Sequence, residues 1–517
     1  MKKIIALFLI ICFCFTAISC ANGSSHPESQ SENPHCSPSS VEGHSDVDDD
    51  KLCDACNSSV VTTFDFYAIN DLHGKFTDTS NTVGVEGLTT YLKTSAALDD
   101  NPIFLSSGDM WQGGGYSNIT KGAIITEWMN SLGFASMTLG NHEFDWGEDY
   151  ISANASLAKF PMLAINIYEK STNKQVDYAQ SSVIVECNGL QVGIIGAAGD
   201  NYSSISSDKV EDVYFKTGSQ LTALVKAESQ RLRNEGADII VYSLHDGYGQ
   251  STSDKTIGNA ALSSYYDLSL SDGYVDIVFE GHTHRSYAAR DSKNIYHLQN
   301  SGDNGGISHA ELEYNFANGK YTVNTAEHVP AAKYRDLDDD KIIAELLDKY
   351  KDDVAKADTV VGTNDIQRDK DSLRSIVAKL YFEAGNARWG DKYDIALGGG
   401  FMTVRSPGYL RSGTLTYADL ESVLPFDNKI VLCSIKGREL STKFINTSNS
   451  NYFVYCGEYG QSIKNNINYN ETYYVIVDTY TALYAPNKLT VIEEYDSNTF
   501  ARDLLAEHIK AGNLTVK

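Results

Sequence analysis

The sequence has few basic residues for its size, and this shortage limits the partners that the protein can bind. Its 517 residues include 42 lysines and arginines against 68 aspartates and glutamates, which gives a formal net charge of −26. A protein that binds a polynucleotide needs a basic surface to neutralise the phosphates, so we expect no polynucleotide partner. A small phosphate compound is not excluded, because bound metal ions can dominate the local field.

Long apolar runs are also lacking beyond the N-terminus, so no transmembrane helix is expected there. The N-terminal run, residues 4–15, follows two lysines and has the length of a signal peptide rather than of a membrane span. It is followed by Ala17-Ile18-Ser19-Cys20, which resembles the processing site of a bacterial lipoprotein with Cys20 as the lipidated residue. Simple signal-peptide cleavage near the same point is the alternative. Both interpretations predict an extracytoplasmic protein, and the first predicts a lipid anchor in the cell membrane.

Cysteines are few, and their positions do not define a disulfide framework. Cys53 and Cys56 form a Cys-x-x-Cys pair in a Ser-rich, acidic stretch. That spacing permits a redox pair or half of a zinc site. A linker disulfide or free thiols fits the surroundings better, because no βαβ pattern is adjacent and an exported protein meets an oxidising environment.

The chain divides by composition into five segments. Residues 1–20 are the export segment, and residues 21–59 are too polar to bury a core, which predicts a disordered tether. Residues 60–335 alternate between strand and helix patterns and predict a layered α/β domain. Residues 336–357 begin with acidic residues and continue with an apolar helical pattern, which predicts a connecting helix. Residues 358–517 are predicted to form a second α/β domain.

Within the first of these domains, five short apolar runs typical of strands end in residues that bind metals. Open α/β sheets gather ligands at the carboxyl ends of their strands, so the five ends are expected to converge. The motifs are Asn70-Asp71-Leu72-His73-Gly74, Gly108-Asp109, Gly140-Asn141-His142-Glu143-Phe144-Asp145, His245 and Gly281-His282-Thr283-His284. The candidate ligands are Asp71, His73, Asp109, Asn141, His245, His282 and His284. This mixture of carboxylate, amide and imidazole suits Zn, Mn, Fe or Co better than Ca, and we expect two divalent ions, Zn or Mn.

The chemistry of these motifs points to phosphoester hydrolysis. Asp71 and His73 are two residues apart, so in a continued extended conformation both side chains would point to one face. Asp109 can bridge two cations, and two cations about 3.5–4 Å apart can clamp a phosphoryl group and activate a water molecule for in-line attack. His142 adjoins a candidate ligand, and Asp145 could orient and charge it. His142 could then stabilise the transition state or protonate the leaving oxygen. Other histidines, among them His297, have no assigned role.

The ordered motifs resemble the 5′-nucleotidase family of calcineurin-like metallophosphoesterases, which includes bacterial UDP-sugar hydrolases and the vertebrate ecto-5′-nucleotidase. The resemblance extends from residue 62 to the end of the chain. It implies a metallophosphoesterase β-sandwich flanked by helices, and a second α/β domain that binds the substrate and swings it to the metals. It also implies that His142 and Asp145 form a catalytic pair. The implied ligands are Asp71, His73, Asp109 and His284 for one metal, and Asp109, Asn141, His245 and His282 for the other.

The resemblance is less even in the second domain. Gly398-Gly399-Gly400, followed by Arg405-Ser406-Pro407, resembles the family's substrate loop Asn-Gly-Gly-Gly-Ile-Arg-Ser-Pro, with Leu397 in place of Asn and three extra residues before Arg405. Arg405 is the expected phosphate contact, because a guanidinium can meet phosphate oxygens bidentately. Arg368 resembles an upstream substrate arginine. Leu424-Pro425-Phe426-Asp427-Asn428 matches the family's Leu-Pro-Phe-Gly-Asn motif, in which Phe426 would stack on a nucleobase.

Tyr480 stands where the family has its second stacking aromatic residue. The Gly-Gly-Asp that normally follows is missing here, and Asn487 could replace it at the ribose. The predicted function is therefore an extracytoplasmic two-metal hydrolase of nucleotides, most simply a 5′-nucleotidase. The altered loops leave open 2′,3′-cyclic nucleotides, 3′-nucleotides or UDP-sugars as substrates. A surface binding protein that has lost turnover is an alternative of another class.

Overall fold

The computed structural model describes residues 45–48, 50–54, 57, 59–78, 83–96, 102–199, 204–249, 266–405, 409–464, 466–483, 489–496 and 499–514. The predictions for the export segment with Cys20, for most of the tether, and for Cys56 and Asn487 therefore lie outside the described residues. A search of the described ranges finds no helix with the length and apolarity needed to cross a bilayer.

Two six-stranded sheets pack face to face in the first domain. The first sheet has the order β14-β13-β1-β2-β3-β4 and the second has the order β11-β12-β10-β9-β7-β6. The first contains β1 (Val61–Ile69), β2 (Ile103–Ser106), β3 (Ser136–Thr138), β4 (Met162–Leu163), β13 (Gly306–Asn315) and β14 (Lys320–Pro330). The second contains β6 (Ser182–Cys187), β7 (Leu190–Ala197), β9 (Ile239–Leu244), β10 (Ile277–Glu280), β11 (Tyr287–Arg290) and β12 (Tyr296–Gln299).

Alternation along β1 builds the core of this sandwich. Phe64 and Phe66 pack with Val241 and Phe279 of the second sheet between the layers. Tyr67 and the other alternate side chains of β1 face outward, because successive residues of a strand point to opposite faces.

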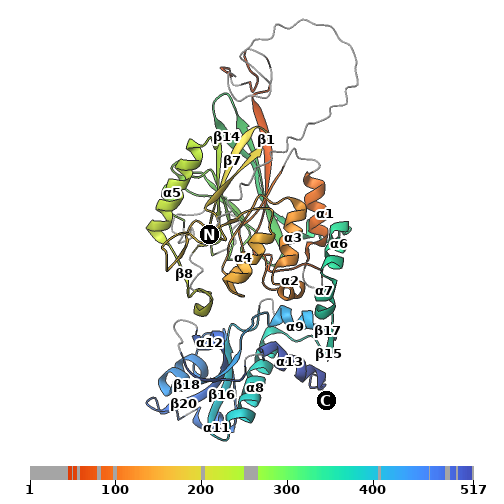
Figure 1. The fold of residues 1–517 in the computed structure, drawn as a ribbon, viewed down its shortest axis with the longest axis vertical. Helices are drawn as coiled ribbons and strands as arrows, with labels where there is room; N and C mark the ends of the chain where they lie inside the picture. The colour runs from red at the N-terminus through yellow and green to blue at the C-terminus, as the bar shows by residue number, and fades with distance from the viewer. Residues whose placement is uncertain are drawn as a thin grey trace, which may run out of the picture.

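Helices cover both outer faces of the sandwich (Figure 1). The outward side chains of the first sheet share a core with α1 (Val85–Ala96), α3 (Ala123–Leu132) and α4 (Glu148–Leu157). The second sheet is covered by α5 (Gly218–Asn234). Smaller elements are α2 (Gly115–Ile119), β5 (Ile167–Glu169), β8 (Val213–Phe215) and the short 3₁₀ turns His142–Phe144, Ser207–Lys209, Leu268–Ser271 and Ala331–Lys333. The predicted metallophosphoesterase β-sandwich flanked by helices is confirmed.

Two short helices, rather than one, connect the domains. They are α6 (Lys341–Lys349), capped by the Asp340 carboxylate on the Ile342 amide, and α7 (Lys351–Ala357). Tyr350 between them departs from helical geometry. Acidic residues in the first turn of α7 favour a new helix N-terminus there.

The second domain is built on a five-stranded sheet of order β19-β16-β20-β18-β21. Its strands are β16 (Ile395–Phe401), β18 (Ile430–Lys436), β19 (Tyr452–Cys456), β20 (Thr472–Asp478) and β21 (Thr490–Glu494), and a separate pair joins β15 (Val360–Asn364) to β17 (Gly413–Thr416). Its helices are α8 (Lys370–Trp389), α9 (Tyr417–Val423), α10 (Gly437–Leu440), α11 (Glu458–Ile463), α12 (Thr479–Leu483) and α13 (Ala501–Lys510), with a π-helical turn at Ser441–Ile445. This α/β domain lies at one end of the sandwich, next to α2 (Figure 1).

Contact between the domains is close at α2 and α9. A Cβ added to Gly115 would lie 2.5 Å from the Cβ of Ala418. Only glycine permits this approach of the two backbones. The two domains therefore meet directly beside the strand ends that carry the predicted site.

Candidate metal centre and catalytic site

The carboxyl ends of neighbouring parallel strands bring the seven candidate metal ligands together. In the first sheet, Asp71 follows β1, Asp109 follows β2 and Asn141 follows β3, and these three strands are parallel neighbours. In the second sheet, His245 follows β9, and the loop with His282 and His284 follows its parallel neighbour β10. Both sheets thus direct the same edge toward the second domain.

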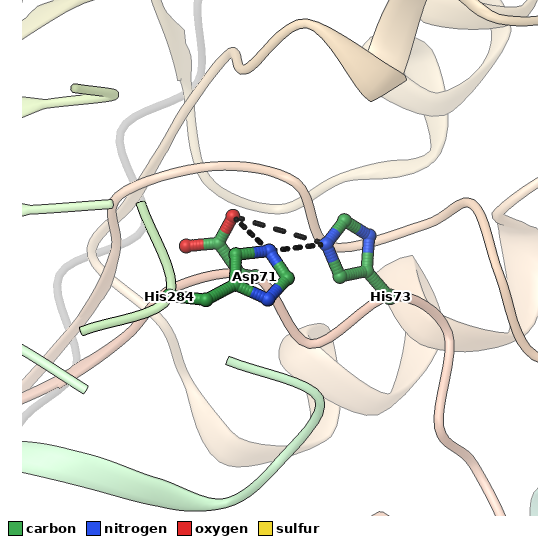
Figure 2. A group of neighbouring side chains, drawn as sticks. All are labelled: Asp71, His73 and His284. Carbon is green, nitrogen blue, oxygen red and sulfur yellow. Dashed lines mark hydrogen bonds and ion pairs between the residues drawn. The ribbon is translucent and has the colours of Figure 1, made fainter. Parts of the chain in front are cut away.

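Asp71, His73 and His284 form the first group of ligands (Figure 2). Asp71 Oδ1 lies 3.2 Å from His284 Nε2 and 3.8 Å from His73 Nε2, and the two imidazole nitrogens are 3.1 Å apart. Asp71 and His73 are fully buried. His73 Nδ1 lies 3.0 Å from the Gln112 carbonyl, which fixes the ring with Nε2 directed at the group.

Asp109, His245 and His282 form the second group. Asp109 Oδ2 lies 3.1 Å from His245 Nε2, and His282 Nδ1 lies 3.0 Å from Asn141 Oδ1. His245 Nδ1 lies 2.6 Å from the Ser107 carbonyl, so its Nε2 faces the other ligands. The two groups divide the ligands as the family resemblance implies for the two metals, with Asp109 in the second group.

The donor atoms fit two divalent cations. Asp71 Oδ1 is buried, yet it accepts no hydrogen bond from any residue that the structure describes. Burial lowers the pKa of His282 to about 4, and burial followed by the charge of Arg405 lowers the pKa of His73 well below its usual value. Both rings are therefore neutral at pH 7, which is the form that binds metal. A Cβ at Gly108 would lie 2.6 Å from His245 Nδ1, so glycine leaves room for this ligand.

Five of the seven ligands have a left-handed backbone. They are Asp71 (φ 51°), His73 (φ 50°), Asp109 (φ 55°), His282 (φ 69°) and His284 (φ 52°). Residues other than glycine rarely adopt this conformation, and such strain concentrates at functional sites. The expected extended conformation after β1 is therefore wrong. The chain turns there instead, held by hydrogen bonds from the Asp71 amide to the Gly108 carbonyl (2.8 Å) and from the His73 amide to the Asp109 carbonyl (3.0 Å).

Glu143 organises these turns, although no role for it was predicted from the sequence. Its buried carboxylate accepts hydrogen bonds from the amides of Asp109 (2.9 Å), Met110 (2.9 Å) and Gly140 (2.7 Å). Burial, followed by repulsion from Asp109, raises the pKa of Glu143 to about 7. The carboxylate thereby joins two ligand-bearing loops. The only sequence signal was an acidic residue within a ligand motif.

His142 and Asp145 are in contact, as the sequence predicts. His142 Nδ1 lies 2.7 Å from Asp145 Oδ2, and the His142 amide donates to Asp109 Oδ1 at 2.8 Å. The carboxylate fixes the ring with Nε2 directed at the second domain. This arrangement suits a group that transfers a proton or stabilises charge at a phosphoryl group.

Arg405 reaches across from the second domain to the candidate metal ligands. Its Nη1 donates to His142 Nε2 at 2.8 Å, and its Nη2 lies 2.6 Å from His73 Nε2. The loop that carries Arg405 is held by Asp478, a fully buried residue to which we assigned no role. Asp478 accepts hydrogen bonds from the Thr403 hydroxyl and from the Thr481 amide, so it ties this loop to the first turn of α12.

A cavity of about 530 Å³ lies between the domains and contains both predicted stacking residues. Phe426 lies beside the His142 ring, with ring centroids 6.2 Å apart and planes inclined by 29°. Tyr480 stacks on Phe401 at 6.5 Å, and its hydroxyl donates to the Ser204 carbonyl at 3.4 Å.

Arg368 is the one described substrate candidate that does not line this cavity. Its Nε donates to Asn364 Oδ1 at 3.1 Å and its Nη2 donates to the Leu514 carbonyl at 2.6 Å, so it holds the end of the chain. Lys370, two residues later, lines the cavity in its place. Burial, followed by repulsion from Arg374 and from Arg405, lowers the pKa of Lys370.

Comparison with known proteins defines the class. Residues 64–286 match the family of calcineurin-like phosphoesterases, and this range contains all seven candidate ligands and the His142–Asp145 pair. The first domain is thus a calcineurin-like phosphoesterase domain, and the chain is a metal-dependent phosphoester hydrolase. The alternative of a binding protein without turnover is not supported, since the seven candidate metal ligands and the His142–Asp145 pair lie together within the matched range.

Individual relatives extend the similarity into the second domain. The chain is 25% identical to protein UshA of Yersinia enterocolitica over 72% of this chain and 74% of that protein. It is also 25% identical to a 5′-nucleotidase of Diplobatis ommata, over 72% of this chain and 69% of that protein. An apyrase of Tabanus yao is 30% identical but aligns with 42% of this chain and 38% of its own length.

Solved structures share the complete two-domain fold. A 5′-nucleotidase precursor from Thermus thermophilus superposes with a TM-score of 0.66 at 17% identity, over 87% of this chain and 96% of that one. A putative 5′-nucleotidase from Staphylococcus aureus gives 0.65 at 18% identity, over 88% and 98%. At these identities the likeness shows the fold alone.

Proposed function

We propose that the enzyme removes phosphate from nucleotides, most simply as a 5′-nucleotidase. The observation that carries the proposal is a single cavity lined by Asp109 and His142 on one side and by Arg405, Phe426 and Tyr480 on the other. A nucleotide could place its phosphate at the metal ligands and its base against the aromatic rings at the same time. Relatives named 5′-nucleotidases, such as that of Diplobatis ommata, support this substrate class.

Different residues of the site have different roles in the proposed reaction. Two divalent cations, Zn or Mn, would supply Lewis acidity for the phosphoryl group when bound by the seven ligands. His142, held by Asp145 at 2.7 Å, keeps Nε2 on the cavity side and can protonate the leaving oxygen. Arg405 can hold the non-bridging oxygens. Closure of the second domain over the site would exclude water.

Nucleotide sugars such as UDP-sugars are the second candidate class of substrate. Besides Arg405, the cavity is lined by Lys209, Lys370 and Lys429. Lys429 pairs with Glu494 at 3.1 Å and Lys209 lies 3.6 Å from Asp208, whereas Lys370 lies close enough to Arg405 for the two positive charges to repel each other. Positively charged lysine side chains beside Arg405 would suit a substrate with more than one phosphate. 2′,3′-Cyclic nucleotides and 3′-nucleotides remain alternatives on the same fold.

The protein is proposed to act outside the cytoplasm as a bacterial lipoprotein anchored through Cys20. The supporting observation is the basic and apolar start followed by Ala17-Ile18-Ser19-Cys20. Expression in bacteria with a radiolabelled fatty acid should label the protein and place it in the membrane fraction. Cys20→Ser should abolish both results, and a labelled Cys20→Ser variant would contradict the anchor.

A substrate panel tests the proposed activity. Metal-loaded enzyme is assayed with nucleoside 5′-monophosphates, 3′-monophosphates, 2′,3′-cyclic nucleotides, UDP-glucose and para-nitrophenyl phosphate. We expect the highest kcat/KM with a nucleoside 5′-monophosphate. Equal kcat/KM for a nucleotide and for the ester without a base would contradict the proposal, although phosphoester hydrolysis would stand.

A further inference from the structure

Asp427 gives the chain an ion pair across the two domains that the family motif lacks. The motif reads Leu-Pro-Phe-Gly-Asn, and Asp427 stands where that pattern has glycine. Its Oδ2 lies 2.9 Å from Lys121 Nζ in the catalytic domain. Its Oδ1 pairs with Arg502 of α13 in its own domain. A glycine at this position could make neither contact.

The ion pair belongs to a larger polar contact between the same elements. Arg502 Nε also pairs with Glu421 at 3.0 Å, and Asn118 of the catalytic domain donates to Glu421 Oε2 at 3.2 Å and to its carbonyl at 3.1 Å. Although burial would raise the pKa of Asp427, Arg502 and Lys121 hold it below its usual value. The carboxylate is therefore charged at neutral pH and can pair with both cations.

These contacts fix the backbone of Phe426 and the direction of its ring. Arg502 Nη1 donates to the Phe426 carbonyl at 3.0 Å, and the next residue is Asp427. Lys121 Nζ lies over the Trp146 ring, 5.1 Å from its centroid, and Trp146 directly follows Asp145 of the catalytic pair. Phe426 is thereby held through its own carbonyl and through Asp427, with its ring beside His142.

We propose that Asp427 is a positioning residue whose ion pair with Lys121 holds Phe426 in place beside the catalytic histidine. The consequence for nucleotides rests on the proposed function, because it requires that a base stacks on Phe426. The side chains of Lys121 and Asp427 are 25% and 30% exposed, so the pair is only partly screened by water. Loss of the pair should weaken nucleotide binding modestly and leave chemistry on an ester without a base intact.

Zero-length cross-linking tests the contact without any substrate. A carbodiimide joins a lysine to a carboxylate only when the two are in contact, and peptide mass spectrometry identifies the product. Lys349 and Glu127 lie 2.6 Å apart away from the cavity and serve as the internal control. We expect a Lys121–Asp427 product in the wild type. If the control pair is joined and Lys121–Asp427 is not, the inference is overturned, whatever the substrate proves to be.

Kinetics of Lys121→Met, Asp427→Gly and the double variant test the positioning role. We expect Lys121→Met to raise KM for a nucleoside 5′-monophosphate by about 2–5-fold, the scale of a partly exposed ion pair. It should leave kcat/KM for para-nitrophenyl phosphate unchanged, as should the control Lys349→Met. The double variant should be no worse than Asp427→Gly alone, because each change removes the same interaction.

Two kinetic outcomes contradict the inference. A loss confined to Asp427→Gly would mean that Asp427 acts through the substrate or through Arg502 and not through Lys121. Additive losses would mean that the side chains of Asp427 and Lys121 act separately. Thermal melting of each variant shows whether it has folded, and Asp427→Asn replaces Asp427→Gly if the glycine variant has not. A wild type that hydrolyses nucleotides no faster than para-nitrophenyl phosphate refutes the proposed function, whereas the cross-linking result still decides the contact.

Discussion

His297 allows a quantitative test of the electrostatics beneath the metal-binding loop. Its ring is fully buried, with Nδ1 3.2 Å from Glu280 Oε2 and Nε2 3.6 Å from Asp291 Oδ2. Burial disfavours the charged ring, but the two carboxylates raise the pKa of His297 to about 9. Glu280 directly precedes the Gly281–His284 loop, so this charge cluster supports the part of the chain that carries two metal ligands.

The pKa of His297 predicts how stability changes with pH. A rise from 6.5 to about 9 corresponds to about 3 kcal/mol, at about 1.4 kcal/mol for each pH unit. This contribution is complete below pH 6.5 and is lost as the pH rises through 9, because the folded state binds more protons than the unfolded state in that window. We expect His297→Gln to lower the free energy of unfolding by up to about 3 kcal/mol at pH 6, and by much less at pH 10.

Urea unfolding between pH 6 and 10 measures this effect. Tryptophan fluorescence reports mainly on the first domain, which holds Trp111, Trp128 and Trp146. A chelator is present throughout, so that metal binding does not contribute to the pH dependence. His508→Gln on α13 is the control and should keep the wild-type dependence. The same loss of stability with pH in the wild type and in His297→Gln would refute the reasoning.

The remaining predictions concern the reaction. Asp109→Ala should remove the bridging ligand and abolish turnover; activity that survives both this change and prolonged chelation would exclude a two-metal mechanism. His142→Ala should lower kcat by about 10²–10⁴-fold with normal metal content, measured by elemental analysis; loss of metal would show that His142 is a ligand. Phe426→Ala should raise KM for a nucleoside monophosphate about ten-fold or more, since a base–aromatic stack contributes about 1–3 kcal/mol. Hydrolysis of para-nitrophenyl phosphate should change little in that variant, whereas Arg405→Ala should impair both substrates; equal losses for Phe426→Ala would show that this ring serves packing.

Residues that follow strands could be predicted well from the sequence. The strands before the ligands have three to nine residues and a recognisable local pattern, and the end of such a strand has a known place at the edge of an α/β sheet. The seven candidate ligands and the His142–Asp145 pair lie together as this rule predicts. The local sequence pattern predicts where along the chain the ligands lie, but it does not predict their backbone conformation. The extended geometry expected at Asp71 was therefore wrong.

Residues that act through distant partners could not be placed in the same way. Arg368 stands in a recognisable motif, yet its guanidinium holds the backbone at Leu514, and Lys370 lines the cavity. Glu143 and Asp478 are both buried, and the sequence around them does not reveal the backbone amides and the hydroxyl that their carboxylates bind. Their partners come from loops that meet because the sheets and domains pack against each other.

The sequence by itself determined the chemistry of this protein, because metal ligands, an imidazole–carboxylate pair and a phosphate-binding arginine are properties of residue types and of short spacings. The tertiary structure decided how that chemistry is assembled. In the folded protein, five of the metal ligands have a left-handed backbone conformation. Arg405 lies within 2.8 Å of His142, and Asp427 of the second domain pairs with Lys121 of the first. These contacts join positions more than 250 residues apart in the chain. The physical reason is that no local pattern encodes such pairs, which arise only when two separately folded cores dock.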